Sequence, residues 1–306
     1  MEYDILVHIG YHKTGTTFLQ KEVFKNPALP FNLIERGLVH KEIIRKNLFF
    51  FDSDHTRSIL TENFRPNCIN VISDEGLLGS PHAGGYNSYD NFLKIKQLFP
   101  NAKILIGIRE QNDIILSGYK QYIKTIGTLD LKRYLTRFKR PSFIAEFDLL
   151  LFCYDKIINT YMNTFGKANV LVLPYELMKV NPEAYFVRLF TFLNLDSEGI
   201  NKVDFKKQLN TSHLNLTLET KRLYNILFTK TRENPHGLLS LPTRMNQPLF
   251  RVTTFLEKQL GKDFQKKLNA RKAKRIHEVA RGFYLESNRK TSELIDIDLK
   301  LYGYEL

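Results

Sequence analysis

Residues 9–17 read Ile-Gly-Tyr-His-Lys-Thr-Gly-Thr-Thr and stand directly after the apolar run Tyr3-Asp-Ile-Leu-Val-His-Ile9. This order predicts a β-strand, a tight loop with two glycines and the start of a helix. Such a loop turns successive backbone N–H groups toward one point, and the N-terminus of the helix adds partial positive charge. The stretch therefore predicts an anion-binding loop at a strand–helix turn.

The loop is close to the Walker A pattern Gly-x-x-x-x-Gly-Lys-[Ser/Thr] of nucleoside triphosphatases, but its lysine is displaced. Gly10 and Gly15 have the spacing of that pattern, whereas Thr16 stands where the lysine belongs. The cation is Lys13, inside the loop, and nothing in the stretch marks a metal site. A P-loop nucleotide kinase or triphosphatase stays an alternative, but position 16 argues against it.

Short runs rich in Ile, Val and Leu recur along the chain, separated by segments with helical periodicity. The strand-like runs are 3–9, 69–73, 103–108 and 169–173, and the helix-like segments are 15–25, 88–99, 111–125, 146–165 and 182–193. Strands that alternate with helices indicate βαβ units and a parallel sheet. We predict a three-layer α/β/α fold with a central, mostly parallel sheet, similar to that of P-loop nucleoside triphosphatases.

Helical patterning dominates the C-terminal third, at 217–230 and 271–295, with a proline-rich loop predicted between them at 232–248. We therefore expect one domain over residues 1–306, with a core of 1–200 and a helical C-terminal part of 201–306.

The composition is that of a globular protein with a strong basic excess. Net charge is +13, from 45 Lys+Arg against 32 Asp+Glu, which favours anionic partners. A non-catalytic polyanion-binding protein is a second alternative, and contact with an acidic membrane surface is compatible with this charge. We expect no nucleic-acid partner. Because no run approaches a signal peptide or the roughly 20 apolar residues of a membrane helix, we expect a cytoplasmic location.

Two further signals follow predicted strands. Arg109 comes directly after 103–108, and Ser117 follows eight residues later. An arginine fork and a hydroxyl can converge on one phosphate, although Arg109 could equally pair with a nearby carboxylate. Tyr175 follows the strand at 169–173 and could contact a base or pack in the core. Since ligands of parallel sheets bind at the carboxyl ends of strands, these residues are candidates for one site.

Together these motifs resemble the sulfotransferases that use 3′-phosphoadenosine 5′-phosphosulfate (PAPS). The resemblance rests on Lys-Thr-Gly-Thr-Thr at 13–17, on the spacing of Arg109 and Ser117, and on Tyr175-Glu followed by Asn181-Pro182. The ending from Glu286 to Tyr304 is similar to that of bacterial members. The resemblance is thin between residues 20 and 65 and between 230 and 280.

The resemblance implies the nucleotide contacts. Lys13 would contact the phosphosulfate, while the backbone amides of Thr14, Gly15, Thr16 and Thr17, with the hydroxyls of Thr16 and Thr17, would hold the 5′-phosphate. The 3′-phosphate would lie on Arg109 and Ser117, and Tyr175 would lie near the adenine. The late Arg-Lys-Gly of many animal cytosolic members is missing here. Substitute contacts could come from the region that follows residue 205, where Lys206, Lys207, Asn210 and Ser212 stand.

The general base is the second catalytic assignment beside Lys13. Glu75 follows the strand at 69–73 and is placed to take the proton of an acceptor hydroxyl, as the glutamate of glycan-modifying sulfotransferases does. Helix capping by Ser73 and Asp74 is an alternative explanation for the same residues. The other candidates are the nearby histidines His12, His40 and His82.

The resemblance implies in-line sulfuryl transfer to an acceptor hydroxyl or amine, with 3′-phosphoadenosine 5′-phosphate (PAP) as the product. Because a sulfuryl group carries less charge than a phosphoryl group, we expect no metal. The position of Glu75 favours a saccharide or glycoconjugate acceptor over a small metabolite. The sequence leaves the oligomeric state open.

Overall fold

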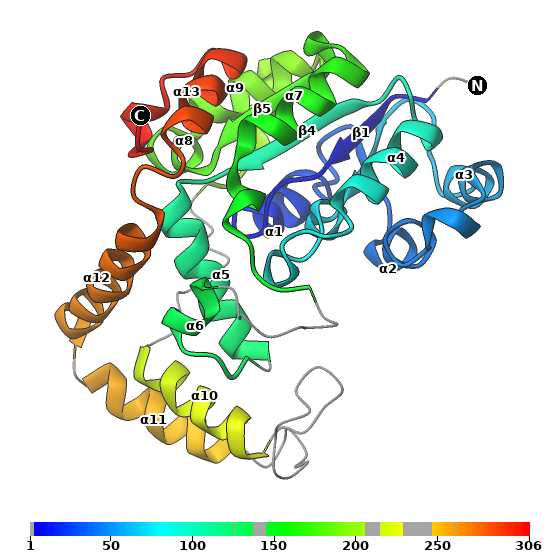
Figure 1. The fold of residues 1–306 in the computed structure, drawn as a ribbon. Coiled ribbons are helices and arrows are strands. Elements are labelled where there is room, and N and C mark those ends of the chain that lie inside the picture. Colours follow the sequence, from blue (N-terminus) through cyan, green and yellow to red (C-terminus); the bar gives the residue numbers. More distant parts are fainter. Residues whose placement is uncertain (1–2, 126, 137–144, 206–214, 229–246, 260) are drawn as a thin grey trace. The chain divides into compact units, whose positions relative to one another are not determined.

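The computed structural model describes residues 3–125, 127–136, 145–205, 215–228, 247–259 and 261–306 (Figure 1). The chain forms two compact units. The first unit comprises Met1–Gln111, Leu150–Leu209 and Gly282–Leu306, and the second comprises Asn112–Leu149 and Asn210–Arg281. The single domain over 1–306 stays a prediction.

The first unit is built on a five-stranded parallel sheet with the order β2-β3-β1-β4-β5. The strands are β1 (Ile5–His8), β2 (Phe31–Leu33), β3 (Ile69–Ser73), β4 (Lys103–Ile108) and β5 (Val170–Pro174). Nearly every residue of β3, β4 and β5 is buried, as expected for parallel strands covered on both faces. The central strand β1 pairs with β3 on one side and β4 on the other, so the direction of sheet growth reverses at β1. Parallel sheets bind ligands at the carboxyl ends of strands beside such a switch.

Helices cover both faces of this sheet. The α-helices of the unit are α1 (Thr16–Phe18), α2 (Arg36–Val39), α3 (Ser53–Thr61), α4 (Ser88–Leu98), α7 (Tyr154–Phe165), α8 (Tyr175–Val180), α9 (Pro182–Phe192) and α13 (Leu285–Ile295). Shorter 3₁₀ turns are η3 (Leu48–Phe50), η4 (Glu75–Leu78), η5 (Pro81–Ala83), η6 (Leu149–Phe152), η7 (Lys167–Asn169), η8 (Ser197–Lys202) and η10 (Leu299–Tyr302), and two π-helical turns are η1 (Leu19–Val23) and η2 (His40–Ile44).

One face of the sheet carries the largest apolar cluster. Leu6, Val71 and Leu105 of the strands pack against η1, α8 and α9, whose buried members include Leu19, Leu177 and Phe186. On the other face α7 contacts β4 and β5, and Tyr161 of α7 meets Phe92 of α4 edge-on at 5.0 Å. The predicted three-layer α/β/α fold with a parallel sheet is confirmed.

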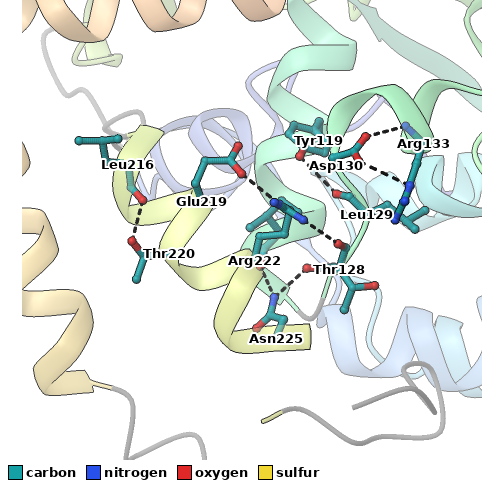
Figure 2. Close-up of polar contacts among 12 residues, drawn as sticks. Tyr119, Thr128, Leu129, Asp130, Arg133, Leu216, Glu219, Thr220, Arg222 and Asn225 are labelled. Carbon is teal, nitrogen blue, oxygen red and sulfur yellow. Dashed lines mark hydrogen bonds and ion pairs between the residues drawn. The ribbon is translucent and has the colours of Figure 1, made fainter. Parts of the chain in front are cut away.

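In the described part of the second unit, all regular elements are helices. Its helices are α5 (Gln111–Thr125, of which Gln111 belongs to the first unit), α6 (Leu131–Leu135), α10 (Asn215–Phe228), α11 (Gln247–Gln259) and α12 (Gly261–Ala280). Polar contacts fix α10 to the chain that links α5 to α6 (Figure 2). Arg222 donates to the Thr128 carbonyl at 3.4 Å, and the Asn225 amide donates to the carbonyls of Ile123 and Gly127 at 3.0 and 2.9 Å. The bond to Ile123 satisfies a carbonyl in the last turn of α5, where a helix leaves acceptors free, and the bonds to Gly127 and Thr128 hold the chain that follows the helix.

Three of the predicted helical segments differ in the structure. The helical segment predicted over 271–295 is interrupted after Ala280, where Gly282 has φ 73°, so it forms parts of α12 and α13. The segment predicted over 146–165 contains η6 and then α7, and the segment over 15–25 is a short α-helix that continues as a π-turn. Most of the predicted loop 232–248 lies outside the described residues. Within the described ranges, no helix is both long and apolar enough to cross a membrane.

Candidate functional site

The loop after β1 is held by β4 and by its own side chains. The backbone N–H of Ile9 donates to Leu105 and that of Tyr11 to Gly107, each at 3.0 Å, so the loop leaves the sheet only after Tyr11. The Thr14 hydroxyl is buried and donates to the Tyr11 carbonyl at 2.6 Å. Lys13 then adopts φ 71° and Gly15 φ 87°, and the helical turns start at Thr16. The predicted strand–loop–helix order is confirmed.

Glycine is required at two points of this arrangement. Gly15 has left-handed φ, and a Cβ there would lie 3.2 Å from Met178 Cε and 3.3 Å from the ring of Tyr175. At Gly107 of β4, a Cβ would lie 2.8 Å from the Thr14 hydroxyl. The two glycines let the loop approach β4 and α8 closely. Lys13 is thereby brought beside the carboxyl ends of β1 and β4.

Thr16 supplies the clearest sign of a ligand-binding position. Its side chain is buried, and among the described residues its Oγ1 has no hydrogen-bond partner. A buried hydroxyl without a partner is costly, so such an atom indicates a ligand oxygen. Thr17 is half-buried beside it at the start of the same helical run, and Lys13 is exposed. The residues present therefore fit an anion, and the Thr14 hydroxyl supports the loop rather than the ligand.

Arg109 follows β4 and contacts two other predicted site residues, Lys13 and Tyr175. Its Nη1 donates to the carbonyl of Lys13 at 3.2 Å, and its Cζ lies 5.1 Å from the ring centroid of Tyr175. Its Nε lies 4.0 Å from Oε1 of Glu176. The Tyr154 hydroxyl donates to the backbone carbonyl of Arg109. A guanidinium stacked on an aromatic ring and held at both ends is well oriented for an anion.

Glu176, to which the sequence motif assigns no role, helps to orient the guanidinium of Arg109. Its Oε1 accepts from the backbone N–H of Glu110 and its Oε2 from the Tyr304 hydroxyl, both at 3.2 Å. Burial raises the pKa of Glu176, although these hydrogen bonds and Arg109 favour the charged form. The only sequence signal was its place directly after Tyr175.

Ser117 lies on the second turn of α5, in the second unit. Its helical position agrees with the motif spacing, and its convergence with Arg109 on one phosphate stays a prediction. The substitute candidates Lys206, Lys207, Asn210 and Ser212 lie outside the described residues.

The carboxylates after β3 have different surroundings. Asp74 is fully buried: it accepts from the Gly76 N–H at 2.7 Å and from Arg36 Nε at 2.6 Å, and it lies 2.9 Å from His40 Nε2. These contacts make Asp74 the cap of η4, as helix-capping chemistry predicts. His40, a candidate base in the sequence, is bound to this cap.

Glu75 is the first residue of η4, and its two carboxylate oxygens have different surroundings. Its Oε1 lies 3.3 Å from Arg36 Nη2, while its buried Oε2 has no hydrogen-bond partner among the described residues. Arg36 was missed in the sequence because it lies in the stretch where the family resemblance is thin. By bridging Asp74 and Glu75, it fixes the direction of the Glu75 carboxylate.

Two histidines share this neighbourhood. Burial lowers the pKa of His12, against the opposing effects of the Glu75 charge and the Gly79 carbonyl. Burial, with the charges of His12 and Lys13, lowers the pKa of His82 to about 4. The charges in this neighbourhood therefore affect one another: they belong to Lys13, His12, Glu75 and His82. A histidine with so low a pKa is neutral at pH 7 and is a weak base.

Behind the loop, His8 ties the strands together. Its Nδ1 lies 2.8 Å from the Ser73 hydroxyl, and the Gln20 amide donates to the Ser73 carbonyl at 3.0 Å. These contacts join β1, β3 and η1. In the described part of the chain, no three His, Cys, Asp or Glu side chains gather as metal ligands do.

Comparisons with known proteins point in one direction. The sequence matches the family described as sulfotransferase domain over residues 3–294. The crystal structure of a sulfotransferase from Alicyclobacillus acidocaldarius has a similar fold, with a TM-score of 0.56, 15% identity and 99% of each chain covered. At this identity the likeness concerns the fold. No curated protein matches the sequence.

Two further solved structures align less closely. Mouse sulfotransferase SULT7A1 complexed with PAP covers 88% of this chain and 89% of its own, at 17% identity and a TM-score of 0.42. The sulfotransferase domain from the curacin biosynthetic pathway covers 64% of this chain and 75% of its own, at 13% identity and the same TM-score.

Proposed function

Since the chain belongs to the sulfotransferase domain family, we propose that it transfers a sulfuryl group from PAPS to an acceptor hydroxyl or amine. The observation that carries this proposal is the contact of Arg109 with Lys13 and Tyr175 near the buried hydroxyl of Thr16, which has no hydrogen-bond partner among the described residues. Bound PAPS would supply a sulfuryl group already activated as a mixed anhydride. The protein's part is to position the reactants and to stabilise charge.

The loop fits the 5′ end of the nucleotide. The hydroxyls of Thr16 and Thr17 and the backbone N–H groups from Thr14 to Thr17 would hold the phosphate, because they lie where the loop becomes a helix. Lys13 is exposed beside them and would neutralise charge that develops on the bridging oxygen.

Arg109 would contact the 3′-phosphate together with Ser117 of α5. Its stacking on Tyr175 and its contact with Glu176 restrict the guanidinium before any ligand arrives, which lowers the entropy lost on binding. The ammonium of Lys179 also lies 5.6 Å from the ring centroid of Tyr175. The adenine would therefore contact only the part of the ring that the two cations do not cover.

We propose Glu75 as the general base and Arg36 as the residue that positions it. One carboxylate oxygen is held by Arg36, and the other, which is buried and has no hydrogen-bond partner among the described residues, can accept a proton. His12 and His82 are the competing candidates in the same neighbourhood. His40 is disfavoured because it contacts Asp74.

We propose a saccharide or glycoconjugate acceptor, a reaction without metal and a cytoplasmic protein. The acceptor class is supported by a glutamate at the position where glycan-modifying members of the family have one. A mass-spectrometric screen of saccharides, glycolipids and small hydroxyl compounds with PAPS tests it directly, since each product gains one sulfuryl group.

Thermal-shift measurements separate the proposal from its rivals. A sulfotransferase is stabilised by PAP more than by AMP or by ATP with Mg²⁺, because only PAP carries the 3′-phosphate. A P-loop kinase or triphosphatase would prefer ATP with Mg²⁺. A polyanion-binding protein would respond to heparin with steep salt dependence and little discrimination among nucleotides.

A further inference from the structure

Two adjacent aromatic side chains of the first unit stand almost entirely in water. Phe49 is 96% exposed and Phe50 is 85% exposed, and both belong to η3. Single exposed apolar residues are common on protein surfaces, but two adjacent rings that are almost fully exposed offer an apolar surface that a partner can cover.

The turn that carries these rings is well fixed. The side chain of Asn47 accepts a hydrogen bond from the Phe49 N–H at 2.9 Å, and its carbonyl accepts from the Phe50 N–H at 3.1 Å. The Phe51 N–H donates to the carbonyl of Leu48 at 3.3 Å. The rings are thus presented by a capped 3₁₀ turn, so little backbone entropy is lost when they are buried by a partner.

A buried lysine holds the turn from the inner side. Lys94 of α4 is 2% exposed, and its ammonium donates to the carbonyls of Ile43 and Lys46 at 2.9 and 2.6 Å. It also lies 5.8 Å from the ring centroid of Phe51. Burial of an ammonium is costly unless hydrogen bonds compensate it. Here those bonds anchor the end of η2 to α4, directly before the turn.

Cations precede the aromatic pair. The segment 41–51 contains Lys41, Arg45 and Lys46 and a single carboxylate, Glu42. Glu42 is buried and is contacted by Lys41 at 3.0 Å and by Lys46 at 3.5 Å. Lys41 and Arg45 are exposed. Of the two carboxylates that follow the rings, Asp52 caps α3 and Asp54 is paired with Arg57 at 3.0 Å, so the segment presents positive charge beside two apolar rings.

We propose that the segment 41–51 docks the protein on the surface of an anionic phospholipid bilayer, with Phe49 and Phe50 as the inserting side chains. Aromatic rings enter the boundary between headgroups and acyl chains, and neighbouring cations are attracted to anionic headgroups. A protein partner or a second copy would need a surface of about 1,200 Å² or more. Two rings and three cations are a small footprint, which fits weak and reversible membrane binding.

The docking segment is joined to the candidate base. The π-turn η2, which ends at Ile44, packs on η4 through His40 and Asp74, and Arg36 of the preceding α2 contacts Glu75. Docking would therefore hold Glu75 at a defined position relative to the bilayer. Together with the proposed sulfuryl transfer, on which this step rests, the arrangement favours an acceptor saccharide carried by a lipid.

Sedimentation with lipid vesicles tests the docking surface without any assay of transfer. The full chain is incubated with phosphatidylcholine vesicles that contain or lack phosphatidylglycerol. We expect the wild type to sediment with the anionic vesicles only, and the double variant Phe49→Ser/Phe50→Ser to bind them about tenfold more weakly. Arg45→Gln should lose about fivefold, because one cation near an anionic surface contributes about that factor. The matched control is Leu301→Ser, which removes a side chain that is 77% exposed on η10, and it should bind as the wild type does.

The proposal is wrong if the wild type does not bind anionic vesicles, or if the double variant binds them equally well. Concentration-dependent self-association of the wild type without vesicle binding, lost in the double variant, would identify a second copy as the occupant. The thermal shift with PAP is measured on every variant. If the wild type binds anionic vesicles but shows no thermal shift with PAP, the proposed nucleotide site is wrong and the proposed docking surface is still supported.

Discussion

Arg109 donates a hydrogen bond from its Nη1 to the backbone carbonyl oxygen of Lys13, at 3.2 Å. Lys13 has φ 71°, a left-handed conformation that costs an L-residue about 1–2 kcal/mol. The bond stabilises the loop in this conformation. The residues proposed for opposite ends of the nucleotide therefore support each other, and a change at Arg109 also affects the lysine loop.

Lys13→Ala should separate turnover from nucleotide binding. We expect kcat to fall by about 100-fold or more, because the cation acts on charge that develops in transfer, whereas the Kd for PAP should rise by less than about tenfold. Alanine and lysine share the same left-handed strain, so the loop should keep its conformation. Steady-state kinetics and calorimetry measure the two effects, with Lys21→Ala as the control. A variant that retains most of its turnover would rule out the assigned role.

Arg109→Lys should reduce discrimination between PAP and AMP. Lysine keeps the charge but loses the planar fork and the stacking on Tyr175. We expect PAP affinity to fall by about 10-fold to 100-fold and AMP affinity to fall by clearly less, because AMP lacks the 3′-phosphate and loses only the support that Arg109 gives the lysine loop. Calorimetric titration with both nucleotides measures this difference, and Arg188→Lys on the exposed face of α9 is the control. Equal affinity of the unmutated protein for PAP and AMP would remove the 3′-phosphate site.

Most of the sheet could be predicted because its strands are buried and locally distinctive. The runs at 69–73 and 103–108 coincide with β3 and β4, and the run at 169–173 is displaced by one residue from β5. The three-residue strand β2 was missed, since a short edge strand with an asparagine at its centre carries no clear periodicity. The break between α12 and α13 depends on one left-handed glycine, and a lone glycine is a weak signal inside a helical pattern.

Of the site, the sequence predicts the residues that lie in motifs and misses those that act through the tertiary fold. Lys13, Arg109 and Tyr175 follow strand ends, and the parallel sheet brings these ends to one edge. Arg36 and Glu176 orient Glu75 and Arg109 across distances of 39 and 67 residues in the chain, and no local pattern reports such contacts. The convergence of Ser117 with Arg109 stays a prediction.

Thr16→Val should weaken PAP binding without destabilising the free protein. Valine has nearly the shape of threonine and removes a buried hydroxyl that has no partner among the described residues. Thermal unfolding without ligand should therefore be unchanged or slightly improved. The loss of one hydrogen bond to a charged phosphate should lower PAP affinity by about 10-fold to 100-fold. Thr61→Val on α3 is the control, and undiminished PAP affinity in Thr16→Val would contradict the placement of the phosphate.

Glu75→Gln, compared with His82→Gln, should decide between Glu75 and His82 as the general base. Glutamine can still accept from Arg36, so the geometry of η4 and PAP binding should be preserved. The side chain can no longer take a proton, and kcat should fall by about 100-fold or more. His82→Gln is the matched comparison and should retain most of the activity, since the histidine is a weak base. The opposite ranking of the two variants would move the role to His82.

His8 should make stability depend on pH in the acidic range. Burial lowers the pKa of His8 to about 4, against an ordinary value of 6.5. Between these values the unfolded chain binds a proton that the folded chain excludes, so the free energy of unfolding falls as the pH falls from 6.5 to 4. The loss is on the order of 3 kcal/mol, at about 1.4 kcal/mol per pH unit. His82 adds a loss in the same direction.

His8→Gln should remove one of these contributions while an amide replaces the imidazole beside the Ser73 hydroxyl. Urea unfolding between pH 4 and pH 7 measures the slope of the free energy of unfolding against pH. Relative to the wild type, this slope should decrease by the amount that corresponds to the binding of about one proton. His55→Gln, at an exposed position of α3, is the control and should leave the slope unchanged. Because the comparison concerns the slope, a general loss of stability in His8→Gln does not affect it. An unchanged slope would show that His8 becomes protonated in the folded protein as readily as in the unfolded chain.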